Sequence, residues 1–160
     1  MLVSYPKSGR TWLRYVFHLV GLDVEFTHAG SGTTSRFIGR RFEGIDPSLV
    51  EGRRALFLHR NPIDTAVSLY FQVLRKDLPA GSLRWWRRWL PYTLSGRMPD
   101  RDIDAFVLHE GYGVQKICAF NRAWIDELSG RDEAMILAYE EARQRPVEIF
   151  SRVFHHAGVE

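Results

Sequence analysis

The chain has 160 residues, 45% of them hydrophobic and 26% charged. This composition is typical of one globular domain, and the length disfavours a two-domain enzyme. Lys and Arg number 22 against 19 Asp and Glu, a formal charge of +3, which suits one or a few phosphate groups better than the coating of a polyanion. One cysteine excludes an internal disulfide framework, the sequence has no long apolar run, and its first residues do not resemble a signal peptide. We therefore expect a cytoplasmic protein without a transmembrane helix.

Predicted strands and helices alternate along the chain. The first unit is a buried strand at Leu2 to Tyr5, a turn at Pro6 to Gly9 and a helix at Thr11 to Val20. The later predictions are a strand at Asp23 to Thr27, a loop at Ala29 to Gly44, a strand at Arg54 to His59, a helix at Ile63 to Leu74, an irregular stretch at 77–101, helices at Ile103 to His109 and Val114 to Leu128, a strand at Ala134 to Ala138 and a helix at Pro146 to Ala157. This order predicts an α/β sandwich with a mostly parallel sheet, whose ligands bind at the carboxyl ends of the strands.

The turn between the first strand and the first helix is a candidate anion site, because backbone N–H groups at a helix start are unpaired. Lys7 adds a positive charge, Gly9 permits a close backbone approach to a phosphate, and Ser8 and Thr11 supply hydroxyl donors. The first glycine of the NTPase loop G-x-x-x-x-G-K-[ST] is missing, which disfavours a standard NTPase. The alternative is an ordinary strand–helix turn with solvated cations.

A second polar group follows the next long strand. Arg60 stands at the carboxyl end of that strand, and Ser68 lies about two turns into the following helix. A guanidinium and a hydroxyl so placed are expected to hold one phosphate if the chain turns back there. The alternative is that Arg60 pairs with Asp64 and that Ser68 lies on the helix surface.

Three stretches, in order, resemble the motifs of PAPS-dependent sulfotransferases. Tyr-Pro-Lys-Ser-Gly-Arg-Thr-Trp-Leu (5–13) is similar to that family's 5′-phosphosulfate loop, and Leu-His-Arg-Asn-Pro-Ile-Asp-Thr-Ala-Val-Ser-Leu-Tyr (58–70) to its 3′-phosphate motif. Ile-Leu-Ala-Tyr-Glu-Glu (136–141) is similar to its late strand and Tyr-Glu-Asp segment. The resemblance implies a P-loop-like three-layer sandwich that transfers a sulfuryl group from 3′-phosphoadenosine 5′-phosphosulfate (PAPS) to an acceptor hydroxyl or amine, with PAP as the product.

The resemblance also implies a role for each matching residue. The 5′-phosphosulfate would be surrounded by Lys7, Ser8, Gly9, Arg10 and Thr11, the adenine approached by Trp12 and Tyr139, and the 3′-phosphate, which ATP lacks, held by Arg60 and Ser68. Lys7 would be catalytic, because its charge would meet the negative charge that grows on the departing phosphate oxygen. This scheme requires no metal, and the sequence has no cluster with metal-ligand spacing.

An acceptor hydroxyl must lose its proton, so a general base is expected near the transferred group. His28 is the candidate, because related enzymes have a catalytic histidine between the two cofactor motifs. The alternative is a structural histidine, with Asp23 or Glu25 as the base. His59 is expected in packing, and the expected helix-surface histidines are His109, His155 and His156.

The stretch Leu83 to Leu90 has three tryptophans and three arginines. We expect a lid whose tryptophans pack inward, or else a surface for a glycan, a glycolipid or the membrane interface. The loop Gly30 to Ser35 is the other candidate for acceptor contacts, and the acceptor is expected to be a small molecule, a glycan or a glycolipid. Nucleic acid is not expected, because the overall charge is modest.

Two other functions remain open from the sequence. One is a P-loop-like nucleotide kinase or NTPase, and the other is a non-catalytic PAP- or glycan-binding relic. Residues 1–160 are expected to form a single sulfotransferase-like domain. Members of the family carry a later Arg-Lys-Gly-type segment that closes over the 3′-phosphate, and this sequence does not reach one, so we expect a piece of a longer protein.

Overall fold

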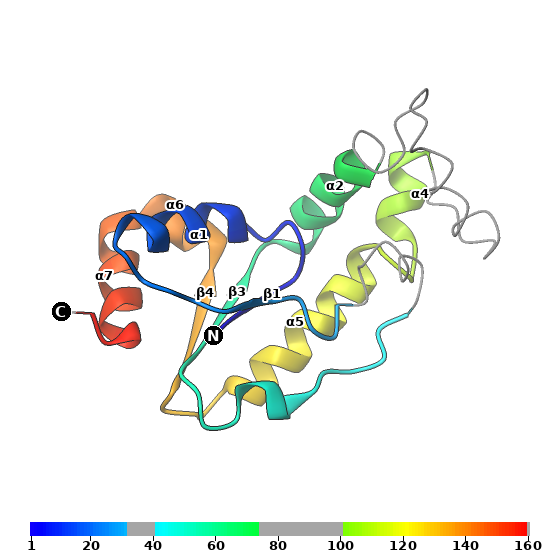
Figure 1. The fold of residues 1–160 in the computed structure, drawn as a ribbon. Helices are drawn as coiled ribbons and strands as arrows, with labels where there is room; N and C mark the ends of the chain where they lie inside the picture. Colours follow the sequence, from blue (N-terminus) through cyan, green and yellow to red (C-terminus); the bar gives the residue numbers. More distant parts are fainter. Residues whose placement is uncertain (32–40, 74–100, 160) are drawn as a thin grey trace, which may run out of the picture.

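The computed structural model describes residues 1–31, 41–73 and 101–159, which form three layers, helices on both sides of a parallel sheet (Figure 1). In chain order the elements are β1 (Leu2–Ser4), α1 (Arg10–Leu19), β2 (Phe26–Thr27), the 3₁₀ turn η1 (Pro47–Val50), β3 (Ala55–His59), α2 (Pro62–Gln72), α4 (Ile103–Leu108), α5 (Val114–Leu128), β4 (Ala134–Ala138), α6 (Tyr139–Gln144) and α7 (Pro146–Ala157). The α/β class and the parallel sheet predicted from the sequence are confirmed.

The sheet has the strand order β2-β1-β3-β4, and every pairing in it is parallel. The longest pairing joins β3 to β4, from Ala55 opposite Ala134 to His59 opposite Ala138. Parallel strands require crossover connections, which helices supply here. The carboxyl ends of the four strands therefore meet at one edge of the sheet, where the chain leaves each strand for a turn or a helix.

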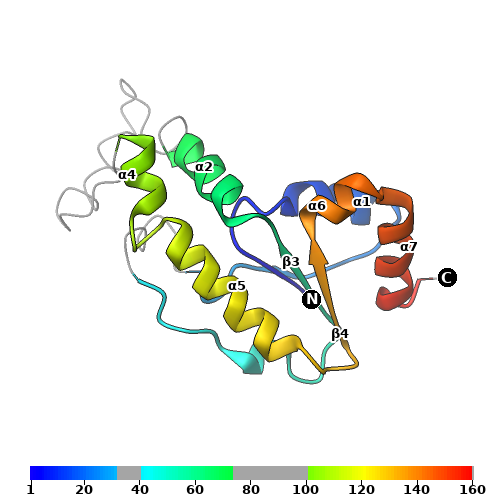
Figure 2. The same ribbon diagram turned by 180° about the vertical axis from the view of Figure 1, so that it is seen from behind.

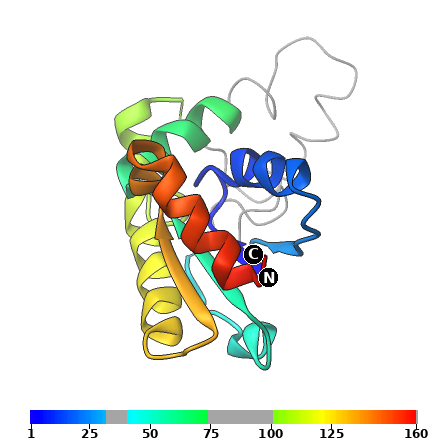
Figure 3. The same cartoon turned by 90° about the vertical axis from the view of Figure 1, so that its left-hand side faces the viewer.

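Side chains of alternate strand residues pack against different helical layers. One side of the sheet is covered by α1, α6 and α7, and the other by α2, α4 and α5 (Figures 1 and 2). In Figure 3, α7 lies in front of the strands. Leu2 and Leu56 belong to the core cluster that contains Leu13 of α1. Val3 and Phe57, the next residues along each strand, belong to the cluster of α5. Both faces are thus buried, as is usual for a parallel sheet.

The structure differs from the sequence prediction in the second strand, in helix α6 and in the 3₁₀ turn η1, which was not predicted. The second strand pairs only over Phe26–Thr27 instead of Asp23 to Thr27; Asp23 is exposed, and the Glu25 side chain pairs with Arg53. Helix α6 was not predicted, since six residues are too few to display a helical period. The stretch 77–100, with Leu83 to Leu90, and residues 32–35 of the Gly30 to Ser35 loop lie outside the described residues.

Candidate functional site

One cavity lies at the edge of the sheet where the four strands end. Each strand is followed by a residue that lines it: Lys7 after β1, His28 after β2, Arg60 after β3 and Tyr139 after β4. Its volume is about 380 Å³. Among the predicted site residues the cavity lining also includes Gly9, Arg10, Thr11, Trp12 and Ser68. The sheet topology thus brings together residues from four separate parts of the sequence.

The N-terminus of α1 at this cavity is not capped by a side chain. The capping position is Gly9, which has the left-handed φ of 99° and no side chain to accept from the first helical amides. No acidic residue stands in the first turn of α1, and Arg10 and Thr11 begin the helix at the cavity. This end of α1 therefore presents N–H groups and the positive end of the helix dipole to an anion.

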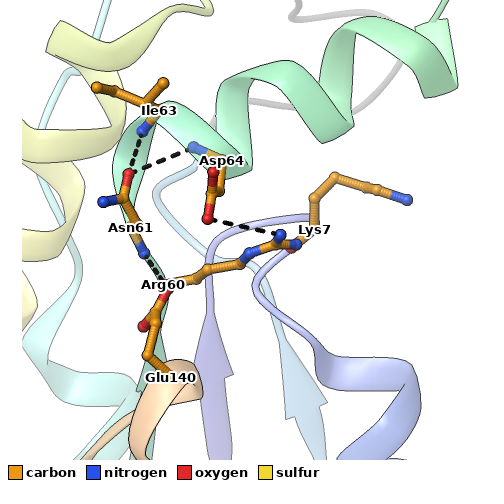
Figure 4. A network of polar contacts seen from close by, with 6 residues as sticks. All are labelled: Lys7, Arg60, Asn61, Ile63, Asp64 and Glu140. Carbon is orange, nitrogen blue, oxygen red and sulfur yellow. Dashed lines mark hydrogen bonds and ion pairs between the residues drawn. The ribbon is translucent and has the colours of Figure 1, made fainter. Parts of the chain in front are cut away.

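The N-terminus of α2 is satisfied internally instead. The Asn61 side chain accepts hydrogen bonds from the N–H groups of Ile63 (2.9 Å) and Asp64 (3.3 Å), as Figure 4 shows. Asp64 also adds a carboxylate to the first turn. Positive charge at this side of the cavity comes from the Arg60 side chain rather than from the helix end.

Arg60 is held by three neighbours. Its guanidinium donates to the Lys7 carbonyl (3.3 Å), lies 3.9 Å from the Asp64 carboxylate and stacks over the Tyr139 ring with its carbon 4.9 Å from the ring centre. The buried Nε has no hydrogen-bond partner among the described residues. The pairing with Asp64 that the sequence allowed is present, and Arg60 nevertheless lines the cavity together with Ser68.

Lys7 adopts a backbone conformation that is rare for residues with a side chain. Its φ is +73°, and every other positive φ in the described part of the chain belongs to a glycine. The Arg60 guanidinium donates to its carbonyl oxygen, while in Figure 4 the Lys7 ammonium extends away from Arg60. The two cationic groups therefore point in different directions.

Trp12 and Tyr139 form an aromatic wall between α1 and α6. Trp12 packs edge-on against Tyr139, with ring centres 6.0 Å apart, and against Phe150 of α7 at 5.2 Å. Both Trp12 and Tyr139 are partly buried and line the cavity. A planar ring such as a nucleobase matches a wall of this kind.

His28 is fixed by a hydrogen bond to the main chain of β1. Its Nδ1 lies 2.6 Å from the Ser4 carbonyl oxygen, which can only accept, so Nδ1 carries the proton and Nε2 is the basic nitrogen of the neutral ring. Burial lowers the pKa of His28, the Ser4 bond partly raises it, and the charge of Arg10 lowers it further, for a net decrease. A histidine kept neutral at the cavity wall has the protonation state of a general base.

Several residues named from the sequence lie away from the cavity. Ser8 is 1% exposed and does not line it. Glu25 pairs with Arg53 at 2.6 Å, and its carbonyl accepts from the Leu2 N–H at the start of β1. Glu25 thus precedes β2 whereas His28 follows it, and neither Glu25 nor Asp23 lines the cavity.

Two of the three expected helix-surface histidines are partly buried instead. His109 ends α4, accepts from the Gly111 N–H at 3.0 Å and stacks on Tyr112. His156 contacts the Ala55 carbonyl at 3.2 Å. His155 is exposed, as expected. His59 stacks on Phe57, which is the packing role predicted for it.

Sequence reasoning did not name two polar residues of this region. Gln72 lines the cavity four residues after Ser68 on α2, and this i, i+4 spacing was the available signal. Glu140 accepts a hydrogen bond from the Asn61 N–H at 2.8 Å, a contact across 79 residues that no local pattern reveals. The stretch from Leu83 to Leu90 is not among the described residues, so its predicted role as a lid or surface has no structural counterpart here.

Metal-binding groups and membrane-spanning helices are both absent from the described residues. No group of three or more His, Cys, Asp or Glu side chains there is arranged to hold a metal ion. Within the same part of the chain, none of the helices has the length and apolar character that a membrane span needs.

Comparison with known proteins gives a match in structure but not in sequence. No protein-family model and no curated protein matches the chain. Among solved structures it is similar to mouse sulfotransferase SULT7A1 complexed with PAP, with a TM-score of 0.60 and 20% identity. The match covers 99% of this chain and 57% of the mouse protein, so the chain spans a little over half the length of that structure. The described chain has the P-loop-like fold of a sulfotransferase.

Proposed function

We propose that this chain binds PAPS and transfers its sulfuryl group to an acceptor hydroxyl or amine. The observation that carries the proposal is the joining of two anion-binding features in one cavity, the uncapped N-terminus of α1 and the Arg60 guanidinium. A ligand with phosphate groups at both ends of a nucleoside matches this pair. The solved neighbour was complexed with PAP, and the resemblance of the three sequence motifs points to the same nucleotide.

The donors at the cavity suit such a nucleotide. The Arg60 Nε is a buried donor without a partner among the described residues, and such donors favour an acceptor that completes their bonding. Lys7 and Arg10 add charge beside the α1 amides. When bound, PAPS supplies the sulfuryl group together with a phosphate leaving group.

Each residue then has a defined task. Arg60 and Ser68 bind the 3′-phosphate, which discriminates PAPS from ATP. Trp12 and Tyr139 contact the adenine, and the α1 turn from Lys7 to Thr11, with Ser8 acting through its backbone, surrounds the 5′ end. Lys7 stabilises the charge that develops on the departing phosphate oxygen, and this preorganised electrostatic effect supplies a large share of catalysis in group transfer.

His28 removes the acceptor proton in this proposal. Its Nε2 is the basic nitrogen because Nδ1 donates to Ser4. Asp23 and Glu25 are not part of the proposed site, since neither lines the cavity. The acceptor itself is proposed to be a small molecule, a glycan or a glycolipid, with the stretch Leu83 to Leu90 as a surface for a glycan or for lipid headgroups. We further propose that the protein works in the cytoplasm without nucleic acid.

The proposal is tested by calorimetry with PAP, AMP and ATP. PAP is expected to bind at least tenfold more tightly than AMP or ATP, because one charge-assisted phosphate contact contributes about 1.5–3 kcal/mol. Arg60→Ala should abolish this preference, while the control Arg53→Ala, at the Glu25 pair outside the cavity, should retain it. Equal affinity of the wild-type protein for PAP and AMP would overturn the proposal and favour a nucleotide kinase or NTPase.

Transfer itself requires a second experiment. Labelled PAPS is offered with oligosaccharides, glycolipids and small phenols, and label is sought in each acceptor. Tight and selective PAP binding without any labelled product would support a non-catalytic PAP-binding protein instead.

A further inference from the structure

Glu140 joins the end of β4 to the phosphate-binding end of β3. Pairing between these strands stops at His59 opposite Ala138. Two contacts then continue beyond the last paired residues: the Arg60 guanidinium stacks over Tyr139, and the Asn61 N–H donates to Glu140 Oε1 at 2.8 Å. Figure 4 shows the Glu140 carboxylate reaching the chain directly after Arg60.

The hydrogen bond to Glu140 fixes the peptide group that follows Arg60. The N–H of Asn61 belongs to the peptide plane whose carbonyl is that of Arg60, so a hydrogen bond to this N–H restrains the backbone dihedral ψ of Arg60. Asn61 is anchored on its other side by its amide oxygen, which accepts from Ile63 and Asp64. With both sides held, the residue is locked at the junction of β3 and α2.

The arrangement resembles a capping box whose acidic residue comes from another helix. In a local capping box, a Glu three residues after the cap accepts from the N–H of the capping residue. Here the capping residue is Asn61 and the Glu lies 79 residues away, in the first turn of α6. A carboxylate at that position is also favourable for α6 itself. Glu140 therefore connects two helix starts at the cavity edge.

We propose that Glu140 is a positioning residue for the 3′-phosphate: it holds the peptide after Arg60 so that the guanidinium faces the cavity. This inference rests on the proposed function. The property that matters is a hydrogen-bond acceptor at the distance of the Glu side chain, rather than the negative charge. If Arg60 is less well positioned, the affinity for a 3′-phosphate should fall. The contacts of the 5′ end of the nucleotide with the α1 turn should not change.

Two variants of Glu140 separate the effect of side-chain length from the effect of negative charge. Glu140→Gln retains the carbonyl acceptor at the same reach and loses the charge, whereas Glu140→Asp retains the charge and is one methylene shorter. Both residues are tolerated in the first turn of a helix, and Asp is favoured there. Glu141→Asp is the matched control, because Glu141 is the exposed neighbour of Glu140 in the same turn.

The experiment is calorimetric titration of PAP and AMP into each variant, with thermal unfolding measured in parallel. We expect Glu140→Asp to weaken PAP binding about three- to tenfold, the scale of one lost hydrogen bond, with AMP binding nearly unchanged. Glu140→Gln and Glu141→Asp should stay close to wild type. Rescue by Gln and a loss confined to PAP are effects that a general loss of stability would not produce.

The outcomes distinguish this inference from the proposed function. Equal wild-type affinities for PAP and AMP would overturn the proposed function and this inference with it. A wild-type preference for PAP that Glu140→Asp retains would overturn the inference alone. So would a parallel loss of PAP and AMP affinity, or a pattern in which Asp behaves as wild type and Gln does not.

Discussion

Gly9 and Tyr139 approach each other so closely that no side chain fits between them. A Cβ added to Gly9 would lie 2.5 Å from Cδ2 of the Tyr139 ring. The same ring carries the Arg60 guanidinium. The absence of a side chain at Gly9 therefore determines where Tyr139, and with it Arg60, sits relative to the first helix.

Gly9→Ala is expected to lower the free energy of unfolding by about 2 kcal/mol or more, because it combines a left-handed backbone penalty with a steric clash. PAP affinity should fall as well, since Tyr139 must move from beneath Arg60. Chemical denaturation and calorimetry measure the two effects. Gly21→Ala is the control: its φ is +68° and nothing lies within 4 Å of the added carbon, so it isolates the backbone penalty. Equal decreases in the free energy of unfolding for the two variants would show that the Tyr139 contact is unimportant.

Two variants of Lys7 separate the effect of backbone strain on stability from the effect of the ammonium charge on transfer. Its φ of +73° disfavours any residue with a Cβ, so Lys7→Gly should be about 1 kcal/mol more stable than Lys7→Ala. Both variants lack the ammonium, and both should lose sulfuryl transfer to the same extent. Urea denaturation and a labelled-PAPS assay test this pair. A Gly variant less stable than the Ala variant would contradict the strain argument.

The sequence was sufficient for the parts of this fold that depend on local pattern. Apolar strands such as Ala134–Ala138 and long helices such as Val114–Leu128 were predicted at their observed bounds, because apolar residues and chain breakers mark them. The parallel topology followed from alternation, and it placed Lys7, His28, Arg60 and Tyr139 at one edge.

Contacts between distant segments were not predictable in this way. The Glu140 bond to Asn61 and the fit of Gly9 against Tyr139 depend on the sheet order, in which β3 lies between β1 and β4. Burial of His156 likewise requires α7 to lie against the start of β3, where its ring meets the Ala55 carbonyl. Such facts arise from tertiary packing, which no window of sequence contains.

Asp64 is expected to compete with a bound phosphate for Arg60, since its carboxylate lies 3.9 Å from the guanidinium. Asp64→Asn should therefore raise PAP affinity about two- to fivefold, the modest scale of an ion pair whose carboxylate is exposed to solvent, and leave AMP affinity unchanged. It should also lower stability by about 0.3–1 kcal/mol, because a negative charge is lost from the first turn of α2.

The control for this variant is Asp104→Asn, which removes the corresponding first-turn charge of α4. Asp104→Asn should lower stability by an amount similar to Asp64→Asn and leave nucleotide binding unaltered. Weaker PAP binding by Asp64→Asn would instead mean that Asp64 orients Arg60 and does not compete for it.

The protonation state of His28 is expected to set the pH dependence of transfer. Because burial, together with the nearby Arg10 charge, lowers the pKa of His28 below its usual 6.5, the neutral and basic form persists to lower pH than for a solvated histidine. The acid limb of kcat/KM, which reports the free enzyme, should therefore fall at a pH below 6.5. Arg10→Gln removes one cause of the lowered pKa and should move that limb toward higher pH.

Replacement of His28 by Asn tests its role directly. The Asn amide can still donate to the Ser4 carbonyl, so the local structure and PAP affinity should be nearly retained, while transfer should fall by about 100-fold or more. His59→Asn is the matched control, since burial also lowers the pKa of His59 although it does not line the cavity. Its rate should stay close to wild type. Unchanged transfer by His28→Asn would remove the residue from the mechanism, because a structural histidine bonded to Ser4 would account equally well for its position.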